Sequence, residues 1–131
     1  MANPNIVNVT SIVGGNAAWA LSTGVTTTLL TVSADVLVKI NSILAVNTHA
    51  TNATALTLDI NGLGTGATGV TLAANLTTQV RIASTINVPA DDVLVVIDKP
   101  IYLMEGDVLR GGASAASCLE LFASFEVIND A

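Results

Sequence analysis

VLVKINSILAVN, residues 36–47, is the stretch that decides the fold. Its apolar and polar residues alternate, as they do in a β-strand with one buried face, whereas a helix would mix the two sets. One face is expected to carry Val36, Val38, Ile40, Leu44 and Val46, and the other Lys39, Asn41 and Asn47. Fully extended, the stretch would span about 40 Å, which is enough to cross a small sheet. We therefore predict a long strand in the centre of a sheet.

The long strand is expected to contain an irregularity and to have a hairpin partner. Ser42 falls on the apolar face, and Leu37 and Ile43 fall on the polar face. A β-bulge, or cover on both faces of the sheet, would explain these three residues. Residues 54–60 alternate in the same way, so we expect them to pair with the long strand as a hairpin.

The rest of the chain consists of further short apolar segments, separated by turns of Gly, Asn, Asp and Pro at intervals of roughly ten residues. The clearest alternation has Leu119, Leu121, Ala123, Phe125 and Val127 on one face and Glu120, Phe122, Ser124 and Glu126 on the other. Residues 93–97 form a continuous apolar run, which is typical of a strand covered on both faces. The pattern predicts an all-β fold, an antiparallel β-sandwich of about eight strands, of which the jelly roll is one form.

The composition agrees with this fold class. Val, Ile, Leu and Ala provide most of the 51% hydrophobic content, and aromatic residues make up only 3%. Together with abundant Thr, this favours strands over helices. A chain of 131 residues buries most of its apolar surface in one core, so we expect a single domain over residues 1–131.

Charge is scarce in this chain. Charged residues make up 11% of it, against about 25% in a typical globular protein. The mean hydropathy of +0.68 is high, yet no apolar run approaches the roughly 20 residues of a membrane-spanning helix. We therefore expect the excess apolar surface to be buried against other copies of the chain or another protein, and not in a membrane. The net charge of −6 argues against nucleic acid as a partner.

No set of residues predicts an enzyme. The first ten residues, MANPNIVNVT, lack the basic and apolar regions of a signal peptide, so secretion is not expected. The single cysteine, Cys118, is expected to be a small residue of a strand and not a nucleophile. The single histidine, His49, is expected to lie in a solvated loop without a metal or catalytic role.

A glycine motif could bind a cofactor but has a structural interpretation. Gly64, Gly66 and Gly69 spell GxGxxG after a strand, as in dinucleotide-binding turns. The residues that follow lack the apolar stripe of a helix, which such turns require. We interpret residues 61–69 as a glycine loop at the edge or rim of the sandwich and expect no cofactor.

Five acidic residues lie in predicted turns: Asp91, Asp92, Asp98, Glu105 and Asp107. They could bind calcium if their loops converged, but they lack the spacing of a calcium-binding loop. We interpret them as solvated carboxylates and expect no metal.

Two aromatic residues are candidate contact residues between proteins. Trp19, the only tryptophan, could be a core anchor or a residue of a subunit contact. Phe122 lies between two glutamates on the polar face of its strand. An exposed aromatic side chain in a protein with so few charges is typical of a contact surface.

Four segments together carry a resemblance to a known class of proteins. They are KINSI (Lys39–Ile43), the Asn- and Ala-containing loop at Asn47–Ala53, the block from Val88 to Leu109 and the final FEVI strand (Phe125–Ile128). Their order resembles that in small virion proteins of tailed bacteriophages, above all those of phages that infect marine cyanobacteria. The likeness covers most of the chain from about residue 36.

The resemblance implies a structural role in the virion. Such proteins are expected to decorate or cement the head, to assemble as several copies, often trimers, and to contact the major capsid protein or other virion proteins. The location implied is the capsid surface, after synthesis in the host cytoplasm. A tail, neck or fibre component would need the same sandwich and stays open. A carbohydrate-binding module for host attachment is a further alternative, although it should expose several aromatic side chains over a groove.

Overall fold

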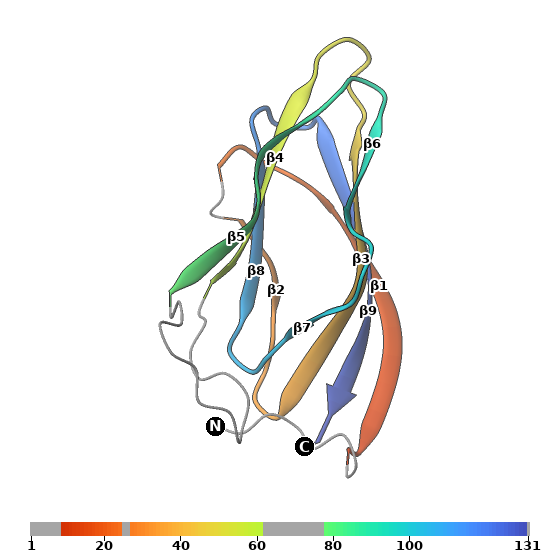
Figure 1. Cartoon of the computed structure of the whole chain (residues 1–131), viewed down its shortest axis with the longest axis vertical. Helices are drawn as coiled ribbons and strands as arrows, with labels where there is room; N and C mark the ends of the chain where they lie inside the picture. Colours follow the sequence, from red (N-terminus) through yellow and green to blue (C-terminus); the bar gives the residue numbers. More distant parts are fainter. Residues whose placement is uncertain (1–8, 25–26, 62–77, 131) are drawn as a thin grey trace.

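The structure is a computed structural model that describes residues 9–24, 27–61 and 78–130. These residues form nine β-strands and no helix (Figure 1). The strands are β1 (Ser11–Ala20), β2 (Thr27–Thr31), β3 (Val36–Asn47), β4 (Thr54–Asn61), β5 (Gln79–Val88), β6 (Val93–Ile97), β7 (Ile101–Leu103), β8 (Val108–Ala113) and β9 (Leu119–Asn129). The predicted all-β class is therefore confirmed.

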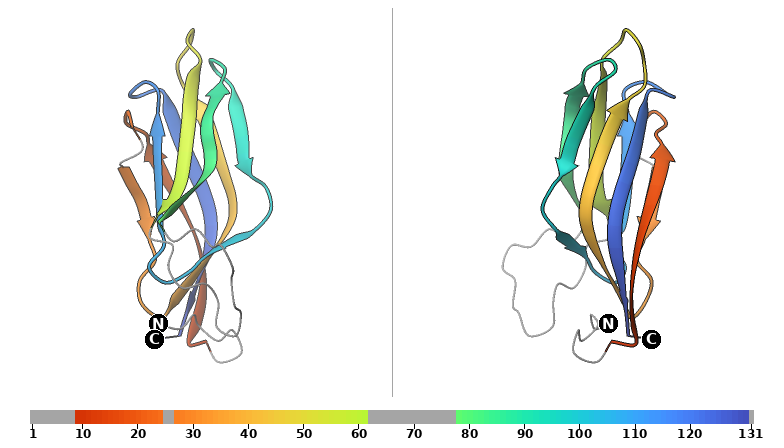
Figure 2. Two further views of the ribbon diagram at one scale, coloured as in Figure 1. Left: turned by 60° about the vertical axis from the view of Figure 1, so that its left-hand side comes forward. Right: turned by 90° about the vertical axis from the view of Figure 1, so that its right-hand side faces the viewer.

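The strands form two antiparallel sheets that pack face to face (Figure 2). Sheet A has the order β1-β9-β3-β6, with β7 also paired to β3, and sheet B has the order β2-β8-β4-β5. Because β6 and β7 both pair with β3, they act as one interrupted strand. The strands then pair in a nested order, the first with the last, the second with the second-last, and so on inward. The pairs are β1–β9, β2–β8, β3–β6/β7 and β4–β5. This nesting is that of a jelly roll, one form of the predicted sandwich.

The core lies between the two sheets and is built from alternate residues of each strand. On β9, Leu119, Leu121 and Ala123 are buried, while Glu120 and Phe122 are exposed. The buried β9 residues meet Leu56 and Leu58 of β4 within one hydrophobic cluster. The alternation predicted for residues 119–127 is thus confirmed.

β3 has the predicted bounds and lies between β9 and β6/β7, but its alternation changes phase in the middle. Ile40 pairs with Phe125 and Ser42 with Ser124, so Asn41 is the extra residue of a β-bulge. Beyond the bulge, Ile43 and Ala45 are the buried residues. The bulge is confirmed, whereas the prediction that Leu44 and Val46 share the buried face of Val36, Val38 and Ile40 is wrong. Both residues lie on the outer face of sheet A.

The predicted hairpin between residues 36–47 and 54–60 is wrong. β4 pairs with β5 and β8 in sheet B, while β3 pairs with β9, β6 and β7 in sheet A. The connection between β3 and β4 crosses from one sheet to the other and is anchored by the buried side chain of Asn47. Its Nδ2 donates to Asn52 O and Val88 O at 2.9 Å each, and its Oδ1 accepts from His49 N. Because the chain crosses to the other sheet, the apolar residues of β4 face those of β3 across the core, and both sets are buried.

Candidate contact surface

Phe122 lies at the centre of an apolar row that runs across sheet A. Its side chain is 43% exposed. The strand register places Phe122 beside Ala18 of β1 on one side and Leu44 of β3 on the other. Leu44 in turn pairs with Val95 of β6, which is 54% exposed. The row therefore reaches from one edge of the sheet to the other.

A second apolar pair extends this row. Val46 pairs with Val93, which is 52% exposed, and both point outward. Val46 also pairs with Glu120 of β9. We call the resulting surface the outer apolar patch, defined as Ala18, Leu44, Val46, Val93, Val95 and Phe122.

Polar and charged groups lie on both sides of Phe122 along β9, and Glu120 is one of them. Next to Phe122 along β9 comes Ser124, which pairs with Asn16 and Ser42. Beyond them, Lys39 Nζ lies 4.0 Å from Glu126 Oε2, and both side chains are partly exposed. An exposed ion pair of this length contributes little to stability. An apolar centre with a polar rim is the usual anatomy of a protein contact.

The outer face of sheet B has a different character. Asp59, fully buried, accepts from Arg110 Nε at 2.9 Å and from Arg110 Nη2 at 2.8 Å. Arg110 Nη2 also donates to Gln79 Oε1 at 3.2 Å. The hydrogen bond to Asp59 raises the pKa of the Arg110 guanidinium. This bidentate pair joins neighbouring strands β4 and β8, so its groups serve the sheet itself.

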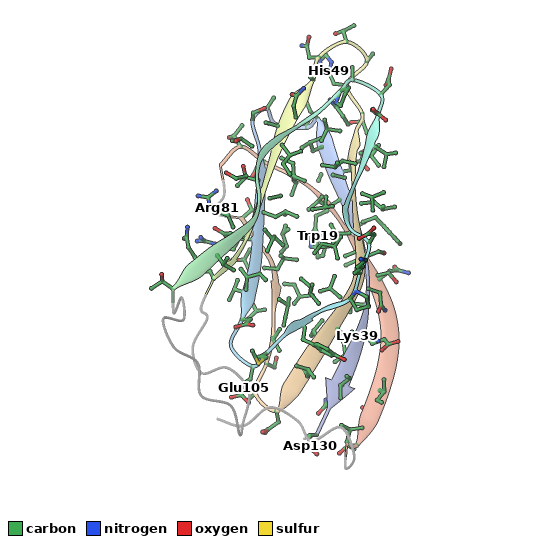
Figure 3. All side chains as sticks on the ribbon, in the orientation of Figure 1. Trp19, Lys39, His49, Arg81, Glu105 and Asp130 are labelled. Atoms are coloured by element: carbon green, nitrogen blue, oxygen red, sulfur yellow. The ribbon has the colours of Figure 1, made fainter. Side chains whose placement is uncertain are left out.

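The two predicted contact residues lie on opposite faces of sheet A. Trp19 pairs with the buried Leu121, is only partly exposed and packs against the core, with its side chain between the two sheets (Figure 3). This placement agrees with the core-anchor interpretation of Trp19. Its role in a contact stays a prediction, as does that of Phe122, although Phe122 is exposed as predicted.

Of the six residues of the outer apolar patch, sequence reasoning identified only Phe122, and it placed four of the others wrongly. Leu44 and Val46 were expected to face the core. The sequence indicated a bulge in this strand but not its position between Ile40 and Leu44. Val93 and Val95 were expected to be buried, because their strand was predicted to be covered on both faces. This prediction is wrong, since β6 is an edge strand whose outer side is exposed. The sequence carried no signal that could have identified them, because an uninterrupted apolar run such as residues 93–97 does not tell whether its strand is central or at an edge.

His49 and Cys118 come from neighbouring loops, since Thr48 N donates to Cys118 O at 2.8 Å. Their side chains are engaged elsewhere. His49 Nδ1 accepts from Thr51 N at 3.2 Å and from Asn52 N at 3.0 Å, and Cys118 Sγ donates to Ala116 O at 3.4 Å. His49 is a loop residue as predicted. Cys118 is buried but lies in the turn before β9, not within a strand as expected.

The acidic turn residues do not converge. Asp91 N donates to His49 O, which places Asp91 at one end of the sandwich, whereas Glu105 lies at the other (Figure 3). Glu105 Oε2 accepts from Asp35 N at 2.8 Å, and Asp92 Oδ1 accepts from Val93 N. Within residues 9–24, 27–61 and 78–130, no three His, Cys, Asp or Glu side chains are arranged to hold a metal ion.

Asp107, in the turn between β7 and β8, is the one carboxyl of this set that is buried. Its Oδ2 accepts from Met104 N at 2.9 Å. Burial raises the pKa of Asp107 above its usual value of 3.8, and the hydrogen bond from Met104 opposes this rise. The folded protein therefore holds this proton more tightly than the unfolded chain does.

Asp107→Asn is expected to flatten the pH dependence of stability. As pH rises from about 3.8 through the raised pKa, the unfolded chain loses the proton first, so the free energy of unfolding falls. Asparagine keeps an acceptor for Met104 N but cannot ionise, so the variant should gain stability over the wild type at pH 7 and not at pH 3. Urea unfolding at a series of pH values measures this difference. A constant difference at all pH values would contradict the assignment.

The glycine motif of Gly64, Gly66 and Gly69 lies outside the described residues. In the part of the chain that the structure describes, no helix has the length and hydropathy needed to cross a membrane.

Comparison with known proteins gives no family. No family model matches the chain, and no curated protein sequence matches it. A solved structure of Bacillus endospore appendages, a novel family of disulfide-linked pili, is 14% identical over 92% of this chain and 90% of that one, with a TM-score of 0.44. The VP2 subviral particle of infectious bursal disease virus is 17% identical over 90% of this chain, with a TM-score of 0.38, and the chain spans 31% of VP2. At these scores, neither likeness indicates what the chain does.

Proposed function

We propose that the chain is a non-enzymatic structural protein of a tailed-bacteriophage virion that decorates or cements the head shell. The observation that carries the proposal is the outer apolar patch. Six neighbouring residues on three adjoining pairs of strands leave apolar side chains in water, in a chain of which only 11% is charged. Monomeric proteins rarely leave such a patch uncovered. The resemblance of four of its segments to small virion proteins supports the same role.

The partners would be other copies of the chain, in a closed oligomer such as a trimer, and the major capsid protein or other proteins of the virion. A protein that binds the assembled shell and not the free coat subunits stabilises the shell by mass action. Such a protein needs a contact surface and no active site. Its location would be the capsid surface, after synthesis in the host cytoplasm.

Immunogold electron microscopy tests this role. Particles of a tailed phage whose genome encodes the chain are purified and labelled with antibodies raised against it. Gold over the head shell is the expected result. Gold confined to the tail, neck or fibres would replace decoration with the second virion role. Particles that lack the chain by immunoblot would contradict a virion role altogether.

A further inference from the structure

β1 forms one edge of sheet A and has an unusual surface for an edge strand. Among the described residues, only β9 pairs with it. Residues 11–16 are all exposed, and Ile12 and Val13, at 59% and 58%, are the most exposed large hydrophobic residues described. Because Ile12 and Val13 are consecutive, their side chains point to opposite faces of the sheet. Apolar surface is therefore exposed on both sides of this edge.

The hydrogen-bond pattern shows which backbone groups of β1 face outward. Leu21 N donates to Leu119 O at 2.9 Å, and the register continues through β1 without a shift. In an antiparallel ladder, residues that bond to the partner alternate with residues that do not. The odd-numbered residues of β1 therefore bond to β9. The even-numbered ones turn their N–H and C=O groups away from β9, and these are Ile12, Gly14, Asn16, Ala18 and Ala20.

The side of the sandwich at which β1 lies has no charged residue on its strands. No charged residue precedes Asp35, so neither β1 nor β2 contains one. β1 and β2 lie together at one side of the sandwich, and β5 and β6 lie at the other (Figure 2). That other side carries charges on β5 and in the turns that flank β6, namely Arg81, Asp91, Asp92, Asp98 and Lys99. Charged residues at an edge prevent pairing with a further strand, and β1 lacks this protection.

Gly14 gives a second reason to assign a partner to β1. A Cβ atom at this position would meet nothing within 4 Å, and its φ is not positive, so the described fold does not require glycine there. Glycine inside a strand lowers its stability and often marks a place where another backbone approaches closely. Gly14 is also one of the residues whose backbone groups face outward.

We propose that β1 of a second copy pairs antiparallel with β1 and continues sheet A across a two-fold axis. A row of backbone donors and acceptors is matched by another strand edge. An edge without charge can meet itself without repulsion, and pairing through it keeps the acidic residues of two chains of net charge −6 apart. This contact goes beyond the proposed function. It uses the backbone edge of β1, which adjoins the outer apolar patch at Ala18.

Asn16→Pro tests the pairing, with Asn16→Thr as the matched control. Proline removes the N–H of an even-numbered residue, so the bonds to β9 are kept and only the outer edge is blocked. Threonine changes the side chain and keeps the N–H. Sedimentation equilibrium should show self-association of Asn16→Pro weakened at least about tenfold, and that of Asn16→Thr close to wild type. Equal association of both variants would overturn the proposal.

Residue-resolved hydrogen exchange of the wild type keeps the test decisive even if Asn16→Pro fails to fold. The even-numbered amides of β1 should be protected at concentrations where the mass shows association, and should exchange rapidly in the monomer. The odd-numbered amides should be protected in both. Free exchange of the even-numbered amides in the associated protein, or a monomer at every concentration, would overturn the pairing. Neither result depends on whether phage particles carry the chain, so the two proposals fail separately.

Discussion

Phe122→Asp is expected to weaken self-association by about 30-fold or more while the fold stays intact. Hot-spot residues, which cluster near the centre of an interface, contribute about 2 kcal/mol or more, and about 1.4 kcal/mol corresponds to a factor of ten in affinity. Phe122 lies at the centre of the outer apolar patch, because Ala18 and Leu44 flank it on neighbouring strands. The substitution also places an unpaired carboxylate in the contact, close to Glu120. Analytical ultracentrifugation over a dilution series measures the change.

Ile86→Asp is the matched control for this variant. Ile86 is 39% exposed on β5, similar to Phe122 at 43%, but it lies in sheet B and outside the outer apolar patch. The control should associate like the wild type and unfold cooperatively. If both variants lose association equally, the loss is caused by the added negative charge and not by its position in the outer apolar patch. If neither loses it, the outer apolar patch is not a contact between copies.

Leu121→Ala is expected to lower the free energy of unfolding by about 2–5 kcal/mol, the usual cost of a cavity left by a buried leucine. Leu121 is fully buried between the sheets, where it pairs with Trp19 and Ala45 on its neighbouring strands. Urea unfolding measures the loss through the shift of the midpoint. Phe122→Ala, one residue along the same strand, should change the free energy of unfolding of the monomer by less than about 1 kcal/mol. Equal losses for the two variants would contradict the assignment of their faces.

The local pattern of single strands could be predicted from the sequence. The bounds of β3 and the alternation of β9 agree with the structure because both depend on the period-two pattern of one segment. The pairing of β4 could not be predicted, because the choice between a hairpin and a crossing to the other sheet depends on residues distant in the chain. The same holds for the position of the bulge at Asn41, which is set by the register between β3 and β9.

The candidate contact surface was only partly predictable for the same reason. Phe122 could be identified because an aromatic residue between two glutamates breaks the pattern of its own strand. Leu44 was assigned to the wrong face because one extra residue in β3 reverses every position after it. Val95 looked like a core residue, since a run of apolar residues does not tell whether its strand is central or at an edge.

The mass of the purified chain by light scattering, measured over a wide concentration series, tests most directly whether copies of the chain cover its excess apolar surface. A closed oligomer, with a mass that is a whole multiple of 13.3 kDa and persists on dilution, is the predicted result. A monomer of 13.3 kDa at every concentration would contradict contacts between copies, and would leave the outer apolar patch to another protein.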